Sequence, residues 1–236
     1  MATILHIETT TLNCGVALFK ENRVLASKNS REEGYSHAEN IMPFIDDLFA
    51  STGIKKTELD AISVSGGPGS YTGLRIGVAT AKGICHALSI PLIAIDTLSI
   101  LMEKAKSLCP NKDAYVSMLD ARRMEVYSRT FTSSSSTPVE SIIIDSSSNS
   151  RFSGIGSICF IGDGALKCQD LLKGEGREFI EAYPKADFAL NLATSAFNDG
   201  QFEDLASYEP MYLKAFKAGV AKDPFNLRDK TNRFAQ

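Results

Sequence analysis

The sequence predicts an α/β fold with two subdomains, on the basis of three observations. At ~150 residues per domain, 236 residues make one large domain or two small ones. Hydrophobic residues make up 44% of the chain and charged residues 22%, which excludes extensive disorder, a collagen-like structure and a coiled-coil rod. Segments of strand composition alternate with segments whose apolar residues have helical spacing, as in α/β proteins.

The first elements are three expected strands and a helix. Strand composition is found in three segments, residues 3–8, 14–20 and 24–28. In the helix that follows, Ser36 is a candidate N-cap and Glu39 stands where a capping box needs it. Apolar residues at helical spacing then form one face, made of Ile41, Phe44, Ile45 and Leu48. Gly53 ends this helix.

Helices and strands alternate through the rest of the first half. The expected order is a strand over 60–65, a glycine-rich loop over 66–73, a helix over 74–88, a strand over 91–95 and a helix over 97–108. Residues 1–108 therefore read β-β-β-α-β-α-β-α, which is the order of the ribonuclease-H-like and actin-like folds.

Residues 109–217 are expected to form a second, smaller α/β subdomain. The expected strands cover 113–120, 125–132, 139–144 and 160–163, and the expected helices cover 164–172 and 189–197. We expect Met211–Lys214 to pack back on the first subdomain and residues 218–236 to form a loose tail. From Lys214 onward the chain carries six basic residues and two acidic ones, which suits a solvated tail or, less readily, a contact with RNA phosphate.

Composition narrows the function classes and the location. A net charge of -3 argues against a strongly basic nucleic-acid binder. Five cysteines without a C-x-x-C pair argue against a disulfide framework and a zinc knuckle, and no H-E-x-x-H zinc motif occurs. The first residues do not have the pattern of a secretory signal and no apolar stretch reaches ~18 residues, so we expect a cytoplasmic protein that does not bind a membrane.

The glycine-rich segment 66–77 allows two interpretations. Its glycine spacing fits neither the P-loop nor the dinucleotide-binding motif. The favoured interpretation is that the glycines allow a tight turn and close packing of helix on strand. The alternative is a loop that binds an anion or a nucleotide, formed by Glu8, Thr9, Gly67, Gly69 and Ser70.

The helix after this loop is apolar on all sides. From Gly73 to Leu88 only Arg75 and Lys82 are charged. Small residues form two rows along it, the first with Gly73, Gly77 and Ala81 and the second with Ala79, Gly83 and Ala87. Such a helix must be covered on more than one side, and its own sheet covers only one. Either the second subdomain or a partner protein covers the other side, and we favour a partner.

Several motifs together resemble one protein family. The segment Ser65–Gly77, SGGPGSYTGLRIG, followed by Ala81-Lys82-Gly83, is similar to the signature of the bacterial TsaB proteins, also called YeaZ. Further similar segments are DARRMEVY at 120–127, GDGA at 162–165, and Pro210 with Tyr212 and Leu213. The resemblance covers about residues 3–214.

The resemblance implies an actin-like ATPase fold and a role in tRNA modification. TsaB proteins are non-catalytic subunits that pair with a TsaD-like catalytic subunit, which attaches threonylcarbamoyl to N6 of the adenosine at tRNA position 37. A TsaE-like small ATPase joins the pair, and tRNA is bound only through the complex. ATP and a metal belong to these partners, so no cofactor is implied for this subunit. The chain alone would form a homodimer through the apolar helices that otherwise meet the partner.

The resemblance also implies a docking face on the helices Ser36–Ala50 and Leu74–Leu88. Its expected residues are His37, Ile41, Phe44, Ile45, Leu48, Tyr71, Leu74, Arg75, Val78, Ala79 and Lys82. Arg122 and Arg123 are interpreted first as ion-pair partners of Asp120 and Glu125, and alternatively as a contact for the small ATPase or for RNA.

The same comparison predicts that the chain is not an enzyme. TsaD relatives hold a metal with two histidines, and Thr97 and Leu101 stand at the matching positions here. The first strand ends in Glu8-Thr9-Thr10 where the family has Asp-Thr-Ser, and Met124 stands where the family has Gly. The alternative function is an actin-like sugar or acid kinase or ATPase, using Glu8, the loop 9–11 and the glycine segment for phosphates.

Overall fold

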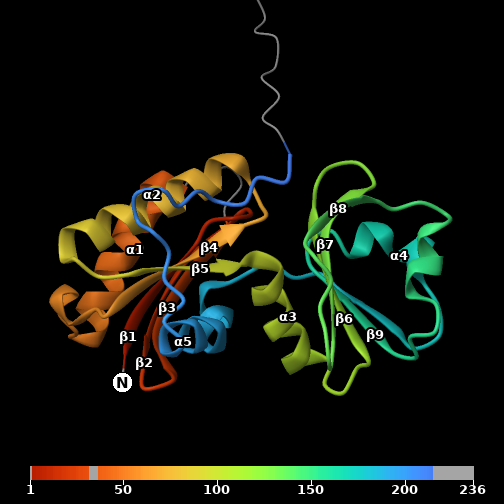
Figure 1. Ribbon diagram of the computed structural model, residues 1–236, viewed down its shortest axis with the longest axis horizontal. Helices are drawn as coiled ribbons and strands as arrows, with labels where there is room; N and C mark the ends of the chain where they lie inside the picture. Colours follow the sequence, from red (N-terminus) through yellow and green to blue (C-terminus); the bar gives the residue numbers. More distant parts are fainter. Residues whose placement is uncertain (1, 32–36, 215–236) are drawn as a thin grey trace, which may run out of the picture.

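The computed structural model describes residues 2–31 and 37–214, and it places one five-stranded sheet in each half of the chain (Figure 1). In the first sheet, an antiparallel meander joins β1 (Thr3–Glu8), β2 (Asn13–Lys20) and β3 (Arg23–Arg31). Next to β1 lie the parallel strands β4 (Ala61–Gly67) and β5 (Leu92–Asp96). The order across this sheet is therefore β3-β2-β1-β4-β5.

The second sheet repeats this arrangement. Its meander consists of β6 (Ala114–Asp120), β7 (Glu125–Thr132) and β8 (Glu140–Ile143). The parallel strands β9 (Ile158–Ile161) and β10 (Arg177–Ile180) follow on the other side of β6, which gives the order β10-β9-β6-β7-β8. A ribonuclease-H-like sheet in each half confirms the predicted actin-like fold class.

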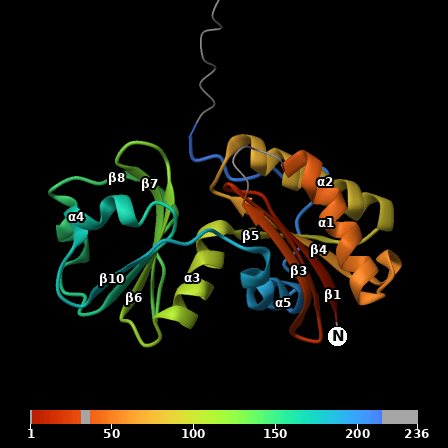
Figure 2. The same cartoon turned by 180° about the vertical axis from the view of Figure 1, so that it is seen from behind.

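Helices cover both faces of the first sheet. One face carries α1 (His37–Thr52) and α2 (Tyr71–Leu88), and its core includes Leu5, Ile7, Val16, Ile62 and Val64. The other face carries α5 (Leu190–Asn198) and the short 3-10 helix Ala186–Ala189, as the view from behind shows (Figure 2). Small side chains of this second layer, such as Ala189 and Ala193, let it pack closely on the strands.

Helix α3 (Thr97–Leu108) lies between the two sheets and packs on both (Figure 1). Ile100 belongs to the core under the first sheet, whereas Leu98 and Leu101 belong to the core under the second. An ion pair of 2.8 Å between Arg129 on β7 and Asp96, the N-cap of α3, also joins the two halves. The opposite face of the second sheet is covered by the 3-10 helices Ser148–Phe152 and Leu166–Cys168 and by α4 (Gln169–Leu172).

A C-terminal segment, residues 203–214, crosses from the first half to the second. It begins beside β5, where the amide of Glu203 donates to the carbonyl of Leu92 at 2.9 Å. It passes the end of β4, where the amide of Met211 donates to the carbonyl of Gly66 at 2.8 Å. It ends at Lys214, whose Nζ donates to the carbonyl of Ala121 at 3.1 Å, and Figure 1 shows this blue segment reaching the gap between the halves. We call residues 203–214 the strap.

The observed elements differ from the expected ones in several places. The helix expected over 189–197 in the second subdomain is α5, which covers the first sheet. α2 begins at Tyr71 rather than near 74, because Ser70 is the N-cap and its Oγ accepts from the amide of Gly73. The expected helix over 164–172 is reduced to one 3-10 turn and the short α4, and β10 was not expected. The expected N-cap Ser36 lies outside the described residues. No helix in the described part of the chain is long and apolar enough to cross a bilayer.

Candidate functional site: the face formed by α1 and α2

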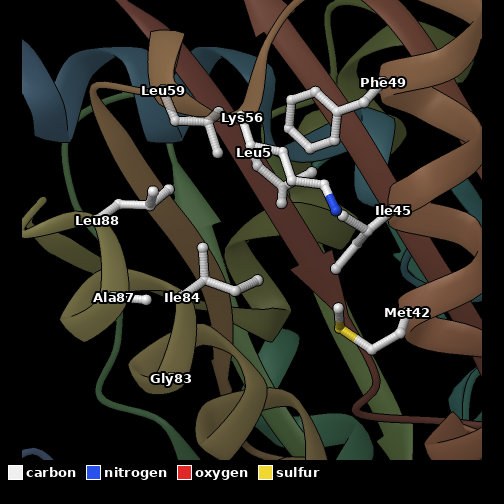
Figure 3. Close-up of a pocket in the computed structure, with 10 residues that line it drawn as sticks. All are labelled: Leu5, Met42, Ile45, Phe49, Lys56, Leu59, Gly83, Ile84, Ala87 and Leu88. Atoms are coloured by element: carbon white, nitrogen blue, oxygen red, sulfur yellow. The ribbon is translucent and has the colours of Figure 1, made fainter.

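An apolar cavity of about 220 Å³ opens between α1 and α2 over the first sheet (Figure 3). Its lining comprises Leu5, Met42, Ile45, Phe49, Lys56, Leu59, Gly83, Ile84, Ala87 and Leu88. Side chains of α1 line one side, the last two turns of α2 line the other, and Leu5 of β1 lies between them. The helices leave this space because Gly83 and Ala87 present almost no side chain on the α2 side.

The structure corrects the composition of the expected docking face. Seven of its eleven residues are buried within the chain, namely His37, Ile41, Phe44, Ile45, Leu48, Leu74 and Val78. The apolar face of α1 points to the strands of its own sheet, which is why its residues recur at helical spacing. The ring of His37 lies under the β1–β2 loop, with Nε2 at 2.9 Å from the carbonyl oxygen of Thr11.

A different set of residues is open to solvent on these helices. On α2, the exposed row consists of Ala79, Gly83 and Ala87, the second of the two rows of small residues. A methyl group added at Gly83 would meet no atom within 4 Å. On α1, Met42 is 44% exposed at the edge of the cavity, although it is not among the residues expected in the docking face. This accessible surface, made of Met42, Ala79, Gly83 and Ala87, is referred to below as the docking surface.

An aromatic cluster lies at the first turn of α2, on the same helix as the exposed row of small residues. The rings of Tyr71 and of Tyr212 in the strap lie 4.7 Å apart. The guanidinium of Arg75 lies 4.1 Å from the centre of the Tyr71 ring, and its Nε donates to the hydroxyl of Tyr212 at 3.4 Å. Tyr71 and Arg75, both expected in the docking face, therefore contact Tyr212, which is more than a hundred positions away in the sequence. Lys82, also expected there, is half-buried and donates to the carbonyl of Ala206 at 3.4 Å.

The glycines of the segment 66–77 are required by close packing. A Cβ on Gly73 would lie 2.0 Å from the carbonyl oxygen of Thr9, and one on Gly69 would lie 2.5 Å from that of Thr10. A Cβ on Gly77 would lie 2.3 Å from the hydroxyl of Thr9. The β1–β2 loop therefore sits directly on the start of α2, which confirms the packing interpretation of these glycines. Gly67, in turn, is covered by Met211 of the strap.

Glu8, the expected anion-site acid, lies at the centre of a buried polar network. Its carboxylate accepts from the amide of Thr10 at 2.7 Å, from the Thr10 hydroxyl at 2.5 Å and from the hydroxyl of Ser65. The side chain is fully buried, and burial raises the pKa of Glu8 although these hydrogen bonds oppose the shift. Each carboxylate oxygen is thus already bound within the chain, and Gly69 and Ser70 of the expected anion loop pack against the backbone of Thr10.

His6 extends this network below Glu8. Its Nδ1 lies 2.7 Å from the hydroxyl of Ser63, and its Nε2 lies 3.2 Å from the hydroxyl of Ser65. Burial lowers the pKa of His6 to about 3, so the ring is neutral in the folded protein at neutral pH.

We therefore expect His6 to make the protein less stable in acid. In the unfolded chain its pKa is 6.5, so between pH 6.5 and about 3 only the unfolded state binds the proton. Each pH unit lost in that range should cost about 1.4 kcal/mol of unfolding free energy. Denaturant titrations at several pH values from about 6 to about 4 give the unfolding free energy as a function of pH. The slope of this free energy against pH should be smaller for His6→Gln than for the wild type. Equal slopes would show that His6 is not buried in its neutral form.

The turn between β6 and β7 departs from its expected ion pairs. Lys167 donates to the carboxylate of Asp120, and Lys214 donates to that of Glu125. The arginines Arg122 and Arg123 are exposed and form no ion pair among the described residues. The interpretation that these arginines pair with the neighbouring acids is therefore wrong, because two lysines distant in sequence occupy those acids.

The positions compared with the metal ligands of TsaD are buried. Thr97 is the first residue of α3, and Leu101 packs into the core between α3 and the second sheet. The described residues contain no group of three or more His, Cys, Asp or Glu side chains that could hold a metal ion.

Comparison with known proteins gives consistent matches. The family model of TsaD, tRNA N6-adenosine threonylcarbamoyltransferase, matches residues 31–208. The tRNA threonylcarbamoyladenosine biosynthesis protein TsaB of Escherichia coli K12 is 28% identical over 89% of this chain and 94% of that protein. The TsaB protein of Bacillus subtilis is 36% identical over 53% of each chain. The structure of YeaZ from Pseudomonas aeruginosa matches with a TM-score of 0.76 and 26% identity, over 90% of this chain and all of that one.

Proposed function

This chain belongs to the tRNA N6-adenosine threonylcarbamoyltransferase (TsaD) family and, within it, to the TsaB (YeaZ) group, and from this premise we propose its function. It acts in the biosynthesis of threonylcarbamoyladenosine in tRNA as a non-catalytic subunit. It binds a TsaD-like catalytic subunit through the docking surface and activates it. The observation that carries this proposal is the exposed row of small residues on α2 beside an apolar cavity.

The shape of the docking surface suits a helix of a partner. Small residues let two helix backbones approach closely, and Ala79, Gly83 and Ala87 follow one another at intervals of four along α2. The cavity beside them, with Met42 at its edge, could receive apolar side chains from that partner helix. Burying this apolar surface would drive the association. Without the catalytic subunit, a second copy of the chain would cover the same surface as a homodimer.

The residues in the places of a catalytic centre support a non-catalytic role. The family enzyme uses two imidazoles as metal ligands at the positions of Thr97 and Leu101. The threonine hydroxyl is a weak metal ligand, and the leucine side chain has no atom that can bind a metal. The carboxylate of Glu8 is enclosed by its own hydrogen-bond donors. In this proposal, ATP and the metal are bound by the catalytic subunit and by a TsaE-like small ATPase, and tRNA is bound by the assembled complex.

Activation would follow from selective binding. If the catalytic subunit exchanges between an inactive and a competent conformation, a partner that binds the competent one better shifts the population toward it. The effect can be no larger than the difference in affinity of this chain for the two conformations.

The test is to mix this protein with the TsaD-like subunit of the same organism and to measure the mass by light scattering on a sizing column. The expected result is a one-to-one complex that replaces any homodimer. The same mixture, supplied with the small ATPase and tRNA, should form threonylcarbamoyladenosine faster than the catalytic subunit alone. Failure to form a complex, with or without nucleotide and the small ATPase, would refute the proposal.

A further inference from the structure

The two arginines of the β6–β7 turn are exposed charged side chains that find no partner among the described residues. Arg122 and Arg123 are exposed, and neither guanidinium forms an ion pair or a hydrogen bond within residues 2–31 and 37–214. The nearby acids do not restrain them, since Asp120 is held by Lys167 and Glu125 by Lys214. Lys167 is further fixed by the carbonyls of Arg123 and Glu125, at 2.8 Å and 2.7 Å. In the described part of the chain the turn therefore presents two unpaired guanidinium groups beside two carboxylates that already pair with lysines.

The backbone of this turn is unfavourable for arginine. Arg122 has φ of 73° and Arg123 has φ of 51°, both in the left-handed region that glycine and asparagine adopt most easily. A turn selected only for its shape would carry those residues. Arginine at two consecutive strained positions points to a role for the side chains themselves.

From these observations we infer that Arg122 and Arg123 bind backbone phosphates of RNA. A guanidinium matches a phosphate with two parallel hydrogen bonds and keeps its charge at any physiological pH. At this turn two arginines and two lysines outnumber the carboxylates of Asp120 and Glu125, and this excess of positive charge favours a phosphate backbone. The inference rests on the proposed function, which makes tRNA the RNA concerned.

The location leaves the docking surface free. The turn belongs to the second sheet and meets the end of the strap at Lys214, whereas the docking surface lies on α1 and α2 of the first half. One chain can therefore hold the catalytic subunit with one half and an RNA phosphate with the other. This chain would contribute to positioning the RNA within the complex, and the base to be modified would be selected elsewhere.

The test replaces both arginines by residues that suit the turn, as Arg122→Asn with Arg123→Gly. Binding of a labelled tRNA transcript to the chain alone, and to its complex with the catalytic subunit, is measured by fluorescence anisotropy from about 50 to 200 mM salt. Loss of two phosphate contacts should weaken binding at least tenfold at low salt and reduce the slope of log affinity against log salt by about 2. The melting temperature should not fall, because asparagine and glycine relieve the backbone.

The control removes two charges elsewhere, as Arg23→Ala with Lys173→Ala, and should leave the slope nearly unchanged. If the Arg122→Asn, Arg123→Gly variant binds RNA with the affinity and slope of the wild type, the inference is wrong. A variant that keeps RNA binding but no longer binds the small ATPase would assign the turn to a protein contact and would also overturn it. Failure of the proposed function would appear separately, because the wild type would then not pair with the catalytic subunit.

Discussion

Ala79→Arg is expected to abolish pairing between this protein and the TsaD-like subunit while the chain stays folded. The Ala79 side chain is exposed in the middle of the row of small residues on α2, so the longer side chain costs the isolated protein little. In a close helix–helix contact it would hold the backbones apart and bury a charge, which should weaken binding by about 3 kcal/mol or more, over a hundredfold. Titration calorimetry and light scattering would measure the loss.

Ser133→Arg is the matched control, because it adds the same charge to an exposed loop of the second half. It should pair normally. Gly83→Arg should reproduce the defect of Ala79→Arg, since Gly83 borders the cavity on the same row. Normal pairing by both α2 variants would place the interface elsewhere. Gly77 is unsuitable for this test, because any side chain there meets Thr9 inside the protein.

Gly73→Ala is expected to cause the largest loss of stability among single methyl additions to α2. The new Cβ would lie 2.0 Å from the carbonyl oxygen of Thr9, and that oxygen belongs to the backbone of the β1–β2 loop and cannot rotate away. Loop and helix would have to separate, and a loss of at least about 3 kcal/mol of unfolding free energy should follow. Denaturant melts followed by circular dichroism would measure it.

Gly83→Ala on the same helix serves as the comparison. Its Cβ meets nothing within 4 Å, and alanine favours a helix over glycine, so a gain of about 0.5 to 1 kcal/mol is expected. Similar effects for the two changes would mean that the β1–β2 loop does not rest on α2 as described. The pair thus separates the packing role of the glycine segment from its helix propensity.

Local signals were sufficient to predict several elements from the sequence. The bounds of α3, Thr97–Leu108, follow from its apolar spacing, and in the structure Asp96 caps it with bonds to the amides of Leu98 and Ser99. The order of strands and helices in the first half likewise predicts its ribonuclease-H-like sheet. By contrast, β10 has only four residues at a sheet edge, close to Gly174 and Gly176, and no periodicity can be recognised over such a length.

The site was harder to predict, because the burial of a helix face and the ion-pair partner of a charged residue depend on residues far away in the sequence. Apolar spacing showed that Ile41 and Phe44 must be covered, but it could not show that their own sheet covers them. Sequence proximity suggested that Arg122 pairs with Asp120, whereas Lys167 takes that carboxylate from 47 positions away. The contact of Tyr212 with Tyr71 depends on the path of the strap and left no local signal.

The position of α5 has a consequence for the protein during its synthesis. The face of the first sheet that contains Ile4, Phe19 and Ile93 is covered by Ala189, Ala193 and their neighbours. After the ribosome has added residue 108, it needs roughly 5 to 20 s more to synthesise the chain up to the end of α5. For that time the nascent chain exposes a broad apolar surface, so residues 1–108 should not fold stably as a fragment.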